Sequence, residues 1–328
     1  MIALNDRQCT QVIRGASELR LGESLPWGDR EREVKAFLRD FRADWTSLHF
    51  VPFGFHPRGV PLAWPRRFLK IVEGSRVHIM FHELWIGISE DSTLKQRAIG
   101  LLQRKCIQWM VRRLAPGLVW TNTAAYSAML KQSHIESAPI TMFGHVPIET
   151  QPGQLPELPD DGELNVVIFG ALHPQWPPEP LFKYLKQAVE RLRRKLRLIS
   201  IGNIGPGGPL WSTLAERYPE VLFLKLGMRP TSELVACFNR CHFGVSTTPF
   251  GLIGKSSSVH SMLEHGLPVI VNRLETQSSS GTAASSDPQL IICDEKLPQV
   301  IVTLPRWPKK SRLKSTADQF LAELAARA

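Results

Sequence analysis

The segment 247–258 contains the residue types that bind an anion, in the order Thr-Thr-Pro-Phe-Gly-Leu-Ile-Gly-Lys-Ser-Ser-Ser. Gly254 lets the backbone approach a ligand, and Lys255 supplies a positive charge. Ser256 and Ser257 can cap a following helix, whose free N–H groups point to the same place. Two residues separate the glycines, where a P-loop has four, so we expect an anion site of another kind. The alternative is a plain helix cap beside an exposed lysine.

A second candidate is His82, which follows the expected strand 77–81 at its carboxyl end. An imidazole there can act as a general base or as a hydrogen-bond partner of a hydroxyl group. His49 and His56 flank another strand end, and a structural role is the alternative for all three. No set of His, Cys, Asp and Glu has the spacing of a metal site, so we expect no metal.

The charge of the chain favours anionic partners. Lys and Arg number 40 against 30 Asp and Glu, which gives a formal net charge of +10. No basic stripe is interleaved with aromatic residues, so we do not expect a nucleic-acid partner. The expected helix 92–114 is basic and amphipathic, a pattern typical of a helix that contacts an anionic membrane from the side and also of an ordinary surface helix.

Length and composition indicate a folded protein of two domains. The 328 residues exceed what one core usually holds, and 43% are hydrophobic against 21% charged. The five cysteines, an odd number, argue against a disulfide framework. The chain has no signal-peptide pattern at its start and no apolar run of membrane-spanning length. We therefore expect a cytoplasmic protein, in peripheral contact with the inner membrane face if the basic helix binds lipid.

The chain divides at the stretch 149–162, which is rich in Pro, Gly and acidic residues and predicts an exposed linker. We expect a first domain at 1–148, a linker at 149–163, a second domain at 164–305 and a C-terminal helix within 306–328. The expected strands are 2–4, 47–51, 77–81, 118–121, 139–143, 164–169, 196–201, 221–226, 242–246 and 268–271. Helical patterns occur in between, for example at 8–13 and 31–41. This alternation predicts parallel sheets covered on both faces, with ligands at the carboxyl ends of the strands.

Several stretches resemble retaining GT-B glycosyltransferases of the "glycosyl transferases group 1", or family 4, type. In the second half these are Val167–Gly170, Ile199–Asn203, Leu226–Leu234 and Phe243–Val271, which ends in a Gly-Leu-Pro-Val-Ile-Val run. In the first half they are Met80–Trp85, Thr121–Tyr126 and Met142–Pro147. The resemblance implies an α/β fold of two Rossmann-like domains that face a cleft. It also implies a sugar transferase of polysaccharide biosynthesis that uses a nucleotide-sugar donor and a glycan or lipid-linked acceptor.

The resemblance also implies roles for individual residues. His82 would hydrogen-bond the transferred sugar or the acceptor, and Lys255 with the Ser256 and Ser257 amides would stabilise the leaving diphosphate. A donor phosphate oxygen would help to deprotonate the acceptor, and no cofactor or metal is expected besides the nucleotide-sugar. The expected donor-binding residues are Gly170, His173, Gly202, Gly227, Met228, Gly254, Lys255, Ser256 and Ser257.

The chain departs from the family pattern in three places. It begins at what resembles the family's second strand, so we expect a first domain without its opening strand and glycine-rich loop. After 164–169 the family usually has an Arg and a Lys, and here only His173 is offered. The family's Glu-x7-Glu pair is not present, because Ser261 stands at the second Glu. The departures leave two alternatives open: an inactive nucleotide- or partner-binding GT-B protein, and a GT-B sugar-nucleotide epimerase.

Overall fold

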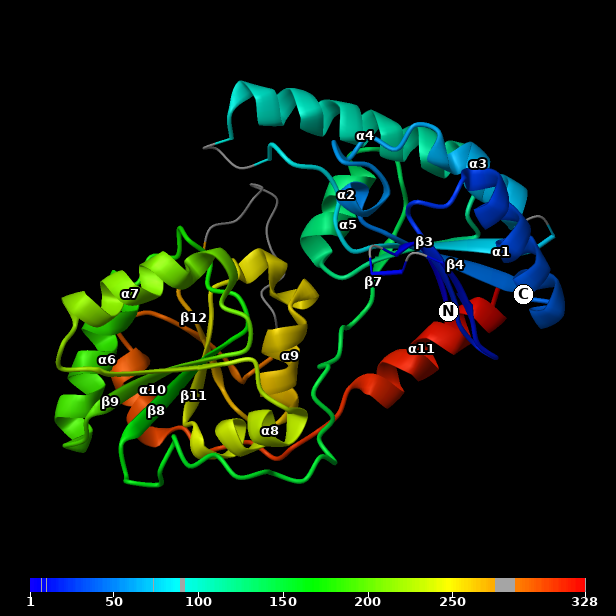
Figure 1. Cartoon of the computed structure of the whole chain (residues 1–328). Coiled ribbons are helices and arrows are strands. Elements are labelled where there is room, and N and C mark those ends of the chain that lie inside the picture. Colours follow the sequence, from blue (N-terminus) through cyan, green and yellow to red (C-terminus); the bar gives the residue numbers. More distant parts are fainter. Residues whose placement is uncertain (7, 10, 73, 89–91, 275–286, 328) are drawn as a thin grey trace. The chain divides into compact units, whose positions relative to one another are not determined.

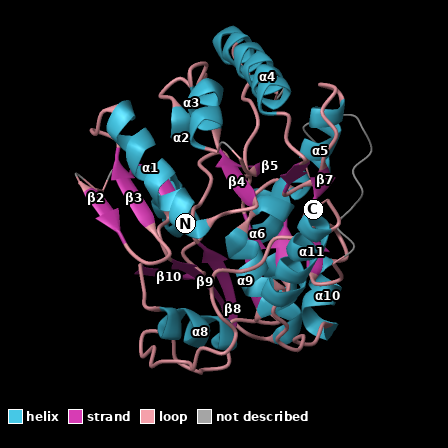
Figure 2. Ribbon diagram, turned by 90° about the vertical axis from the view of Figure 1, so that its right-hand side faces the viewer, coloured by secondary structure: helices cyan, strands magenta, loops and turns pink. Residues whose placement is uncertain are grey.

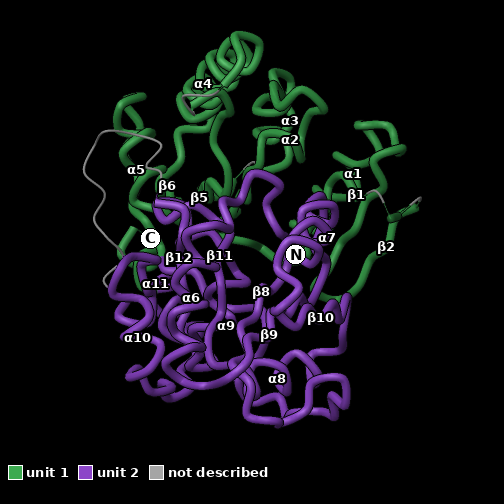
Figure 3. The backbone as a smooth tube through the Cα atoms, turned by 90° about the vertical axis from the view of Figure 1, so that its left-hand side faces the viewer, with its two compact units in different colours: residues 1–140, 322–328 green, residues 141–321 purple. Residues whose placement is uncertain are grey.

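The computed structural model describes all residues except 7, 10, 73, 89–91, 275–286 and 328 (Figure 1). The chain forms two compact units (Figure 3). Unit 1 contains residues 1–140 and 322–328, and unit 2 contains residues 141–321. The finer division into 1–148, 149–163, 164–305 and 306–328 stays a prediction.

Unit 2 is built around a parallel sheet of six strands, counted over the described residues, in the order β10-β9-β8-β11-β12-β13. Its strands are β8 (Leu164–Phe169), β9 (Leu196–Ile201), β10 (Leu222–Gly227), β11 (Phe243–Ser246), β12 (Val269–Val271) and β13 (Leu290–Ile292). Every residue of β8 and β9 is buried, as expected for strands covered on both faces. The predicted parallel α/β architecture is confirmed.

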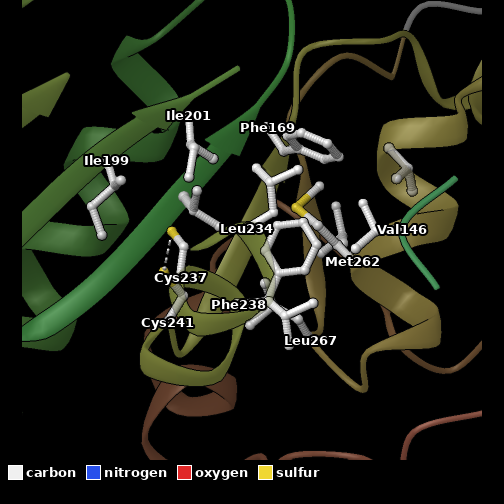
Figure 4. Close-up of a cluster of buried hydrophobic side chains, with 14 of the residues drawn as sticks. Val146, Phe169, Ile199, Ile201, Leu234, Cys237, Phe238, Cys241, Met262 and Leu267 are labelled. Carbon is white, nitrogen blue, oxygen red and sulfur yellow. Dashed lines mark hydrogen bonds between the residues drawn. The ribbon is translucent and has the colours of Figure 1, made fainter. Parts of the chain in front are cut away.

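Helices cover both faces of this sheet (Figures 1 and 2). One face packs against α6 (Glu179–Leu192), α7 (Gly208–Arg217) and α10 (Leu297–Thr303). The other packs against α8 (Thr231–Arg240) and α9 (Ser257–Glu264), and Figure 4 shows the apolar cluster on this side. Alternate residues of β8 serve the two faces, since Val166 belongs to the first cluster and Val167 to the second.

The segment expected to be an exposed linker is partly built into unit 2. Leu155 and Leu158 are 1% and 0% exposed and join the core that Figure 4 shows. The Arg240 guanidinium donates to the carbonyl oxygens of both, with 2.7 Å to the Leu158 oxygen. The expectation of a fully exposed stretch is therefore wrong at these two positions, because two leucines among prolines and acids are enough to anchor it.

Unit 1 contains a parallel sheet in the order β4-β5-β6-β7. Its strands are β4 (Trp45–Phe50), β5 (Arg76–Phe81), β6 (Leu118–Thr121) and β7 (Ala138–Pro139). A second sheet has the order β1-β3-β2, with β1 (Ile2–Asp6), β2 (Val12–Arg14) and β3 (Leu19–Gly22). β1 and β4 belong to different sheets, and a hollow of about 820 Å³ is lined by both.

The helix expected at 8–13 is not formed by its described residues. Val12 begins β2, which pairs antiparallel with β3 after a turn closed by the Gly15 N–H and the Glu18 carbonyl. Leu19 and Leu21 of β3 are fully buried, and they fix the strand that β2 joins. The tertiary pairing therefore decides the structure of a segment whose local pattern is ambiguous.

The helices of unit 1 are α1 (Trp27–Phe41), α2 (Pro52–Phe55), α3 (Trp64–Ile71), α4 (Leu94–Leu114) and α5 (Ala124–Lys131). Helix α11 (Leu313–Ala325) crosses the boundary at residue 322. Two short 3₁₀ helices, η1 (Gly205–Gly207) and η2 (Phe250–Lys255), lie in unit 2.

The expected helix 92–114 is confirmed as α4: Thr93 and Gln96 form a capping box at its start, and Ala115 ends it in a left-handed conformation. Among the described helices, none is both long and apolar enough to cross a membrane.

Candidate functional site

Three of the predicted glycines meet at the carboxyl edge of the sheet in unit 2. Gly170, Gly202 and Gly227 follow or end β8, β9 and β10, with φ angles of 86°, 91° and 68°. Glycine is favoured there because side chains rarely tolerate such angles. The Gly170 N–H donates to the Ile201 carbonyl at 2.9 Å, and the Gly202 N–H donates to the Gly227 carbonyl at 2.7 Å. These bonds hold the three turns side by side.

The N-terminus of α9 lies against the first of these turns. A Cβ atom on Gly170 would come within 3.0 Å of the Ser258 hydroxyl oxygen. Ser256 is the N-cap residue, and its hydroxyl accepts from the Val259 N–H at 3.4 Å. The Ser256 N–H donates to the Ile253 carbonyl at 2.8 Å, so this predicted anion-binding amide is already used. The N–H groups of Ser257 and Ser258 have no hydrogen-bond acceptor among the described residues, and they belong to the positive end of the helix.

Lys255 ends η2 and directly precedes the cap of α9, where it is half-buried. The loop that carries Lys255 is fixed by a hydrogen bond of 2.8 Å from the Phe250 N–H to the Arg273 carbonyl. Arg273 is only 9% exposed and follows β12. The sequence analysis did not single out Arg273, because it follows a short strand and belongs to no motif.

The remaining predicted donor-binding residues differ in their exposure and in their hydrogen bonds. His173 is exposed; its N–H donates to the Thr247 hydroxyl at 3.4 Å, and its ring Nδ1 accepts from the Gln175 N–H at 3.1 Å. Gly254 lies in η2, where its carbonyl accepts from His260 Nε2 at 3.3 Å. Met228 is 76% exposed beyond β10. The structure thus brings the Gly170 turn, Ser257 and Lys255 to one helix end, while Gly202 and Gly227 continue along the sheet edge and Met228 lies exposed just after Gly227.

Ser261, which stands where the resembled family has its second glutamate, is buried. Ser261 is 0% exposed, and its hydroxyl donates to the Ser257 carbonyl at 2.9 Å and accepts from the His145 N–H at 3.0 Å. Glu264, one turn further, is 3% exposed and accepts from the Gly144 N–H at 2.9 Å. A Cβ on Gly144 would come within 2.5 Å of the Ser261 Cα. The chain at 144–145 therefore packs directly on α9 and uses both side chains.

In unit 1, the carboxyl ends of three neighbouring strands bring polar side chains together. His49 lies on β4, His82 follows β5, and Asn122 follows β6. His49 Nδ1 and His82 Nε2 are 2.8 Å apart, and the rings are stacked with 5.1 Å between their centres. The Asn122 side-chain nitrogen lies 3.3 Å from His82 Nδ1. Sequence reasoning found His82 and His49 separately but did not predict their contact.

This row of contacts defines the protonation of both rings. The Asn122 N–H donates to His82 Nδ1, so His82 Nε2–H donates to His49 Nδ1 and the proton of His49 lies on Nε2. Burial, followed by the neighbouring His49, lowers the pKa of His82 to about 4, and burial lowers the pKa of His49. Both rings are therefore neutral at pH 7. Both nitrogens of His82 have partners, whereas His49 Nε2 has none among the described residues, and His49 keeps exposed surface although its ring packs against His82.

No group of three or more His, Cys, Asp and Glu side chains in the described part of the chain is arranged to hold a metal ion. Cys237 and Cys241 are buried with their sulfurs 3.8 Å apart, and a dashed line marks this contact in Figure 4. Burial raises the pKa of the Cys241 thiol, which keeps it protonated. These two cysteines therefore belong to the core.

Comparison with known proteins gives matches in structure alone. No family profile and no curated protein matches the sequence. A UDP-forming α,α-trehalose-phosphate synthase from Burkholderia xenovorans aligns with a TM-score of 0.53 and 12% identity, covering 91% of this chain and 78% of the other. A structure described as trehalose-6-phosphate from E. coli bound with UDP-2-fluoro glucose aligns with a TM-score of 0.53 and 10% identity over 100% and 88%.

A third similar structure is a mutant of S. aureus TarM in complex with fondaparinux, α-GlcNAc-glycerol and UDP. It aligns with a TM-score of 0.50 and 15% identity, covering 84% of this chain and 52% of the TarM chain. The present chain thus spans about half the length of TarM. At these identities the likeness establishes the fold. The protein is an α/β protein of two units with parallel, Rossmann-like sheets, and it matches the structures of GT-B glycosyltransferases.

Proposed function

We propose that the protein is a glycosyltransferase that moves a hexosyl group from a nucleotide-sugar donor to a glycan or lipid-linked acceptor. The donor diphosphate would lie at the carboxyl edge of the unit 2 sheet. The observation that supports this placement is the contact of the Gly170 turn with the N-terminus of α9 beside Lys255, with the Gly202 and Gly227 turns next to it along the same edge. Backbone N–H groups, a helix dipole and a lysine are the groups that commonly bind phosphate oxygens.

The same groups suit the chemistry of sugar transfer. Negative charge grows on the diphosphate as the glycosidic bond to the sugar breaks. The first-turn amides of Ser257 and Ser258 together with Lys255 would stabilise this charge more in the transition state than in the bound donor. We propose a route without a metal, because these groups supply the positive charge. As in the family that the sequence resembles, a donor phosphate oxygen would take the acceptor proton with retention at the sugar.

In unit 1 we propose that His49 and His82 recognise a hydroxyl group of the sugar or the acceptor. His49 supplies an N–H at Nε2, and His82 holds the His49 ring in this tautomer through the contact of 2.8 Å. His49 thus takes the contact that the sequence alone assigned to His82. His82 would be a positioning residue.

The proposal is tested by calorimetric titration of nucleoside, nucleoside monophosphate and nucleoside diphosphate against Lys255→Ala. A charge-assisted contact is typically worth about 1.5–3 kcal/mol. Diphosphate binding should therefore weaken by roughly tenfold to a hundredfold, while nucleoside binding stays unchanged. Lys186→Ala, at an exposed lysine of α6, is the matched control and should leave all three affinities unchanged. An equal loss for all three ligands, or no loss at all, would contradict the placement of the donor.

One observation favours a second candidate, a nucleotide-binding protein without turnover. Ser261 stands where the resembled family has a glutamate, and it is buried beneath 144–145. A nucleotide-sugar incubated with the protein and a set of glycan and lipid-linked acceptors distinguishes the two candidates. Acceptor-dependent release of nucleoside diphosphate supports the transferase. Tight binding of donor without release over the same set supports the second candidate.

A further inference from the structure

The outer face of α4 exposes large apolar side chains. Leu94, Leu101 and Leu102 are 85%, 61% and 59% exposed. With Ala98 they stand at positions i, i+4, i+7 and i+8, which fall on one side of a helix. Figures 1 and 2 show α4 on the outside of unit 1.

The fold of unit 1 does not use these leucines, because the opposite face of α4 makes its contacts. A Cβ on Gly100 would come within 1.9 Å of the Ile86 carbonyl oxygen, so the helix lies directly on this chain segment. The Gln103 side-chain oxygen accepts from the Ile86 N–H at 2.9 Å. The side chains buried on this face further along the helix are Cys106, Ile107, Met110 and Leu114. Removal of an outer leucine should therefore cost the fold little.

The charges of α4 all have the same sign. Its 21 residues include six Lys and Arg and no Asp or Glu. Arg104 is used inside the unit, where it donates to the Ser133 hydroxyl and the Gln132 carbonyl. The exposed cations that form no ion pair with any described residue are Lys95, Lys105, Arg112 and Arg113.

Other helices of the same chain carry acidic residues that pair with their lysines. Helix α1 pairs Lys35 with Glu31 at 2.9 Å, and α11 pairs Lys314 with Asp318 at 2.9 Å. Such pairs are typical of helices that face water. The outer face of α4 combines exposed leucines with positive charge that nothing on the helix neutralises, and it therefore complements a surface that is both apolar and anionic.

We propose that α4 docks on the surface of an anionic lipid bilayer, with its axis in the membrane plane. The outer leucines would enter the boundary between headgroups and acyl chains, and the lysines and arginines would contact lipid phosphates. At 1.5 Å per residue the helix offers a contact about 30 Å long. This inference concerns unit 1 alone and does not depend on the proposed sugar transfer.

Sedimentation of the full chain with vesicles tests the proposal. Vesicles of phosphatidylcholine with phosphatidylglycerol should bind the protein, whereas phosphatidylcholine alone should bind it at least about tenfold more weakly, because each cation near an anionic surface adds about 1 kcal/mol. Binding should fall as salt is raised. Equal binding to both kinds of vesicle would overturn the proposal. A folded protein that binds neither would also overturn it and would assign the face to a protein partner.

Two sets of variants separate the apolar contribution from the charge. Leu101→Ser with Leu102→Ser should weaken binding to anionic vesicles by about tenfold or more, since buried leucines each contribute on the order of 1.5–3 kcal/mol. The matched control is Leu321→Ser, at a leucine of α11 that is 62% exposed. Circular dichroism checks that each variant is folded. If the control weakens binding as much as the double variant, α4 is not the docking helix.

The charge set replaces Lys105, Arg112 and Arg113 by Gln. Binding to anionic vesicles should fall by about a hundredfold at low salt, by the same cost of about 1 kcal/mol for each cation. The control replaces the three exposed cations of α6, Lys183, Lys186 and Arg191, by Gln, which gives the same net charge. If both triple variants lose affinity equally, the attraction comes from the net charge of the chain, and the assignment to α4 is wrong.

Discussion

The carboxyl edges of the two sheets present different chemical groups. In unit 2 the edge consists largely of backbone, with glycine turns at Gly170, Gly202 and Gly227 and the first-turn amides of α9, and Lys255 adds one charged side chain. In unit 1 the corresponding edge consists of side chains, with His49, His82 and their asparagine partner in a row. Backbone amides in fixed turns suit a ligand of fixed shape and charge, such as a diphosphate. Neutral imidazoles suit hydroxyl groups.

One architecture thus offers two kinds of binding group. Ligands of parallel α/β sheets bind at the carboxyl ends of the strands in both cases. The kind of ligand depends on whether the loops after the strands present backbone N–H groups or side chains. Loss of a histidine side chain should therefore affect unit 1 chemistry strongly, whereas the unit 2 edge should be sensitive to backbone geometry as well as to the loss of Lys255.

The largest effect is expected at the histidine pair. His49→Ala and His82→Ala should each slow sugar transfer by roughly tenfold to a thousandfold, and both should leave nucleoside diphosphate affinity unchanged. The double variant should be little worse than either single one, because the two rings act as a unit. The measurements are single-turnover rates and calorimetry. The control is His134→Asn, at an exposed left-handed position that Asn tolerates. Full turnover in both single variants would leave unit 1 without the proposed role.

A smaller effect is expected at the unit 2 edge. Gly170→Ala places a side chain at a φ of 86° and within 3.0 Å of the Ser258 hydroxyl. It should lower the free energy of unfolding by about 1–3 kcal/mol. The shift of the turn should also weaken diphosphate binding by roughly tenfold, equivalent to one amide contact.

Gly162→Ala is the matched control for this variant. Its φ is 78°, and nothing lies within 4 Å of the added Cβ. It should reproduce the loss of stability that comes from backbone strain and leave diphosphate affinity unchanged. If both variants weaken diphosphate binding equally, the effect of Gly170 is a general loss of stability, and the backbone character of this edge is not what binds the ligand.

The smallest effect concerns pH. Burial lowers the pKa of His82 to about 4, below its unfolded value of about 6.5. Between these values the unfolded chain binds a proton that the folded chain does not, so stability falls as pH decreases from 6.5 towards 4. His82→Gln should remove roughly 1 kcal/mol of this pH-dependent loss at pH 5. Urea unfolding at pH 7.5 and 5 measures it. An unchanged pH dependence in the variant would mean that His82 titrates normally.

Much of unit 2 could be predicted from sequence because its signals are local. The strands at 164–169 and 196–201 are short, mostly apolar runs that end in glycine turns, and they form β8 and β9 with the same bounds. Helix α4 has a cap at one end and a stop at the other, and both are readable in the sequence. The glycine turns follow the strands directly, so their place at the edge follows from the strand prediction.

The rest depends on contacts between distant segments. The His49–His82 contact requires the parallel register of β4 and β5, in which His49 lies opposite Met80. The burial of Ser261 depends on the packing of residues 144–145 onto α9, and no local sequence pattern predicts this packing. The stretch 276–287, rich in Ser, Ala and Gly, predicts a loop, and its residues 276–286 lie outside the described residues.

The division of the chain into units has a consequence for its synthesis on the ribosome. Unit 2 is one continuous stretch, whereas unit 1 includes residues 322–328, and Trp120 of β6 donates its indole N–H to Glu323 at 3.0 Å across 203 positions. The contacts of unit 1 are therefore complete only after residues 322–328 have emerged, although its strands are made before unit 2. Closing so long a loop costs little more than closing a shorter one, because the entropy cost grows with the logarithm of length. The delay is therefore the time needed to translate unit 2. During this time unit 1 lacks the contacts of the end of α11.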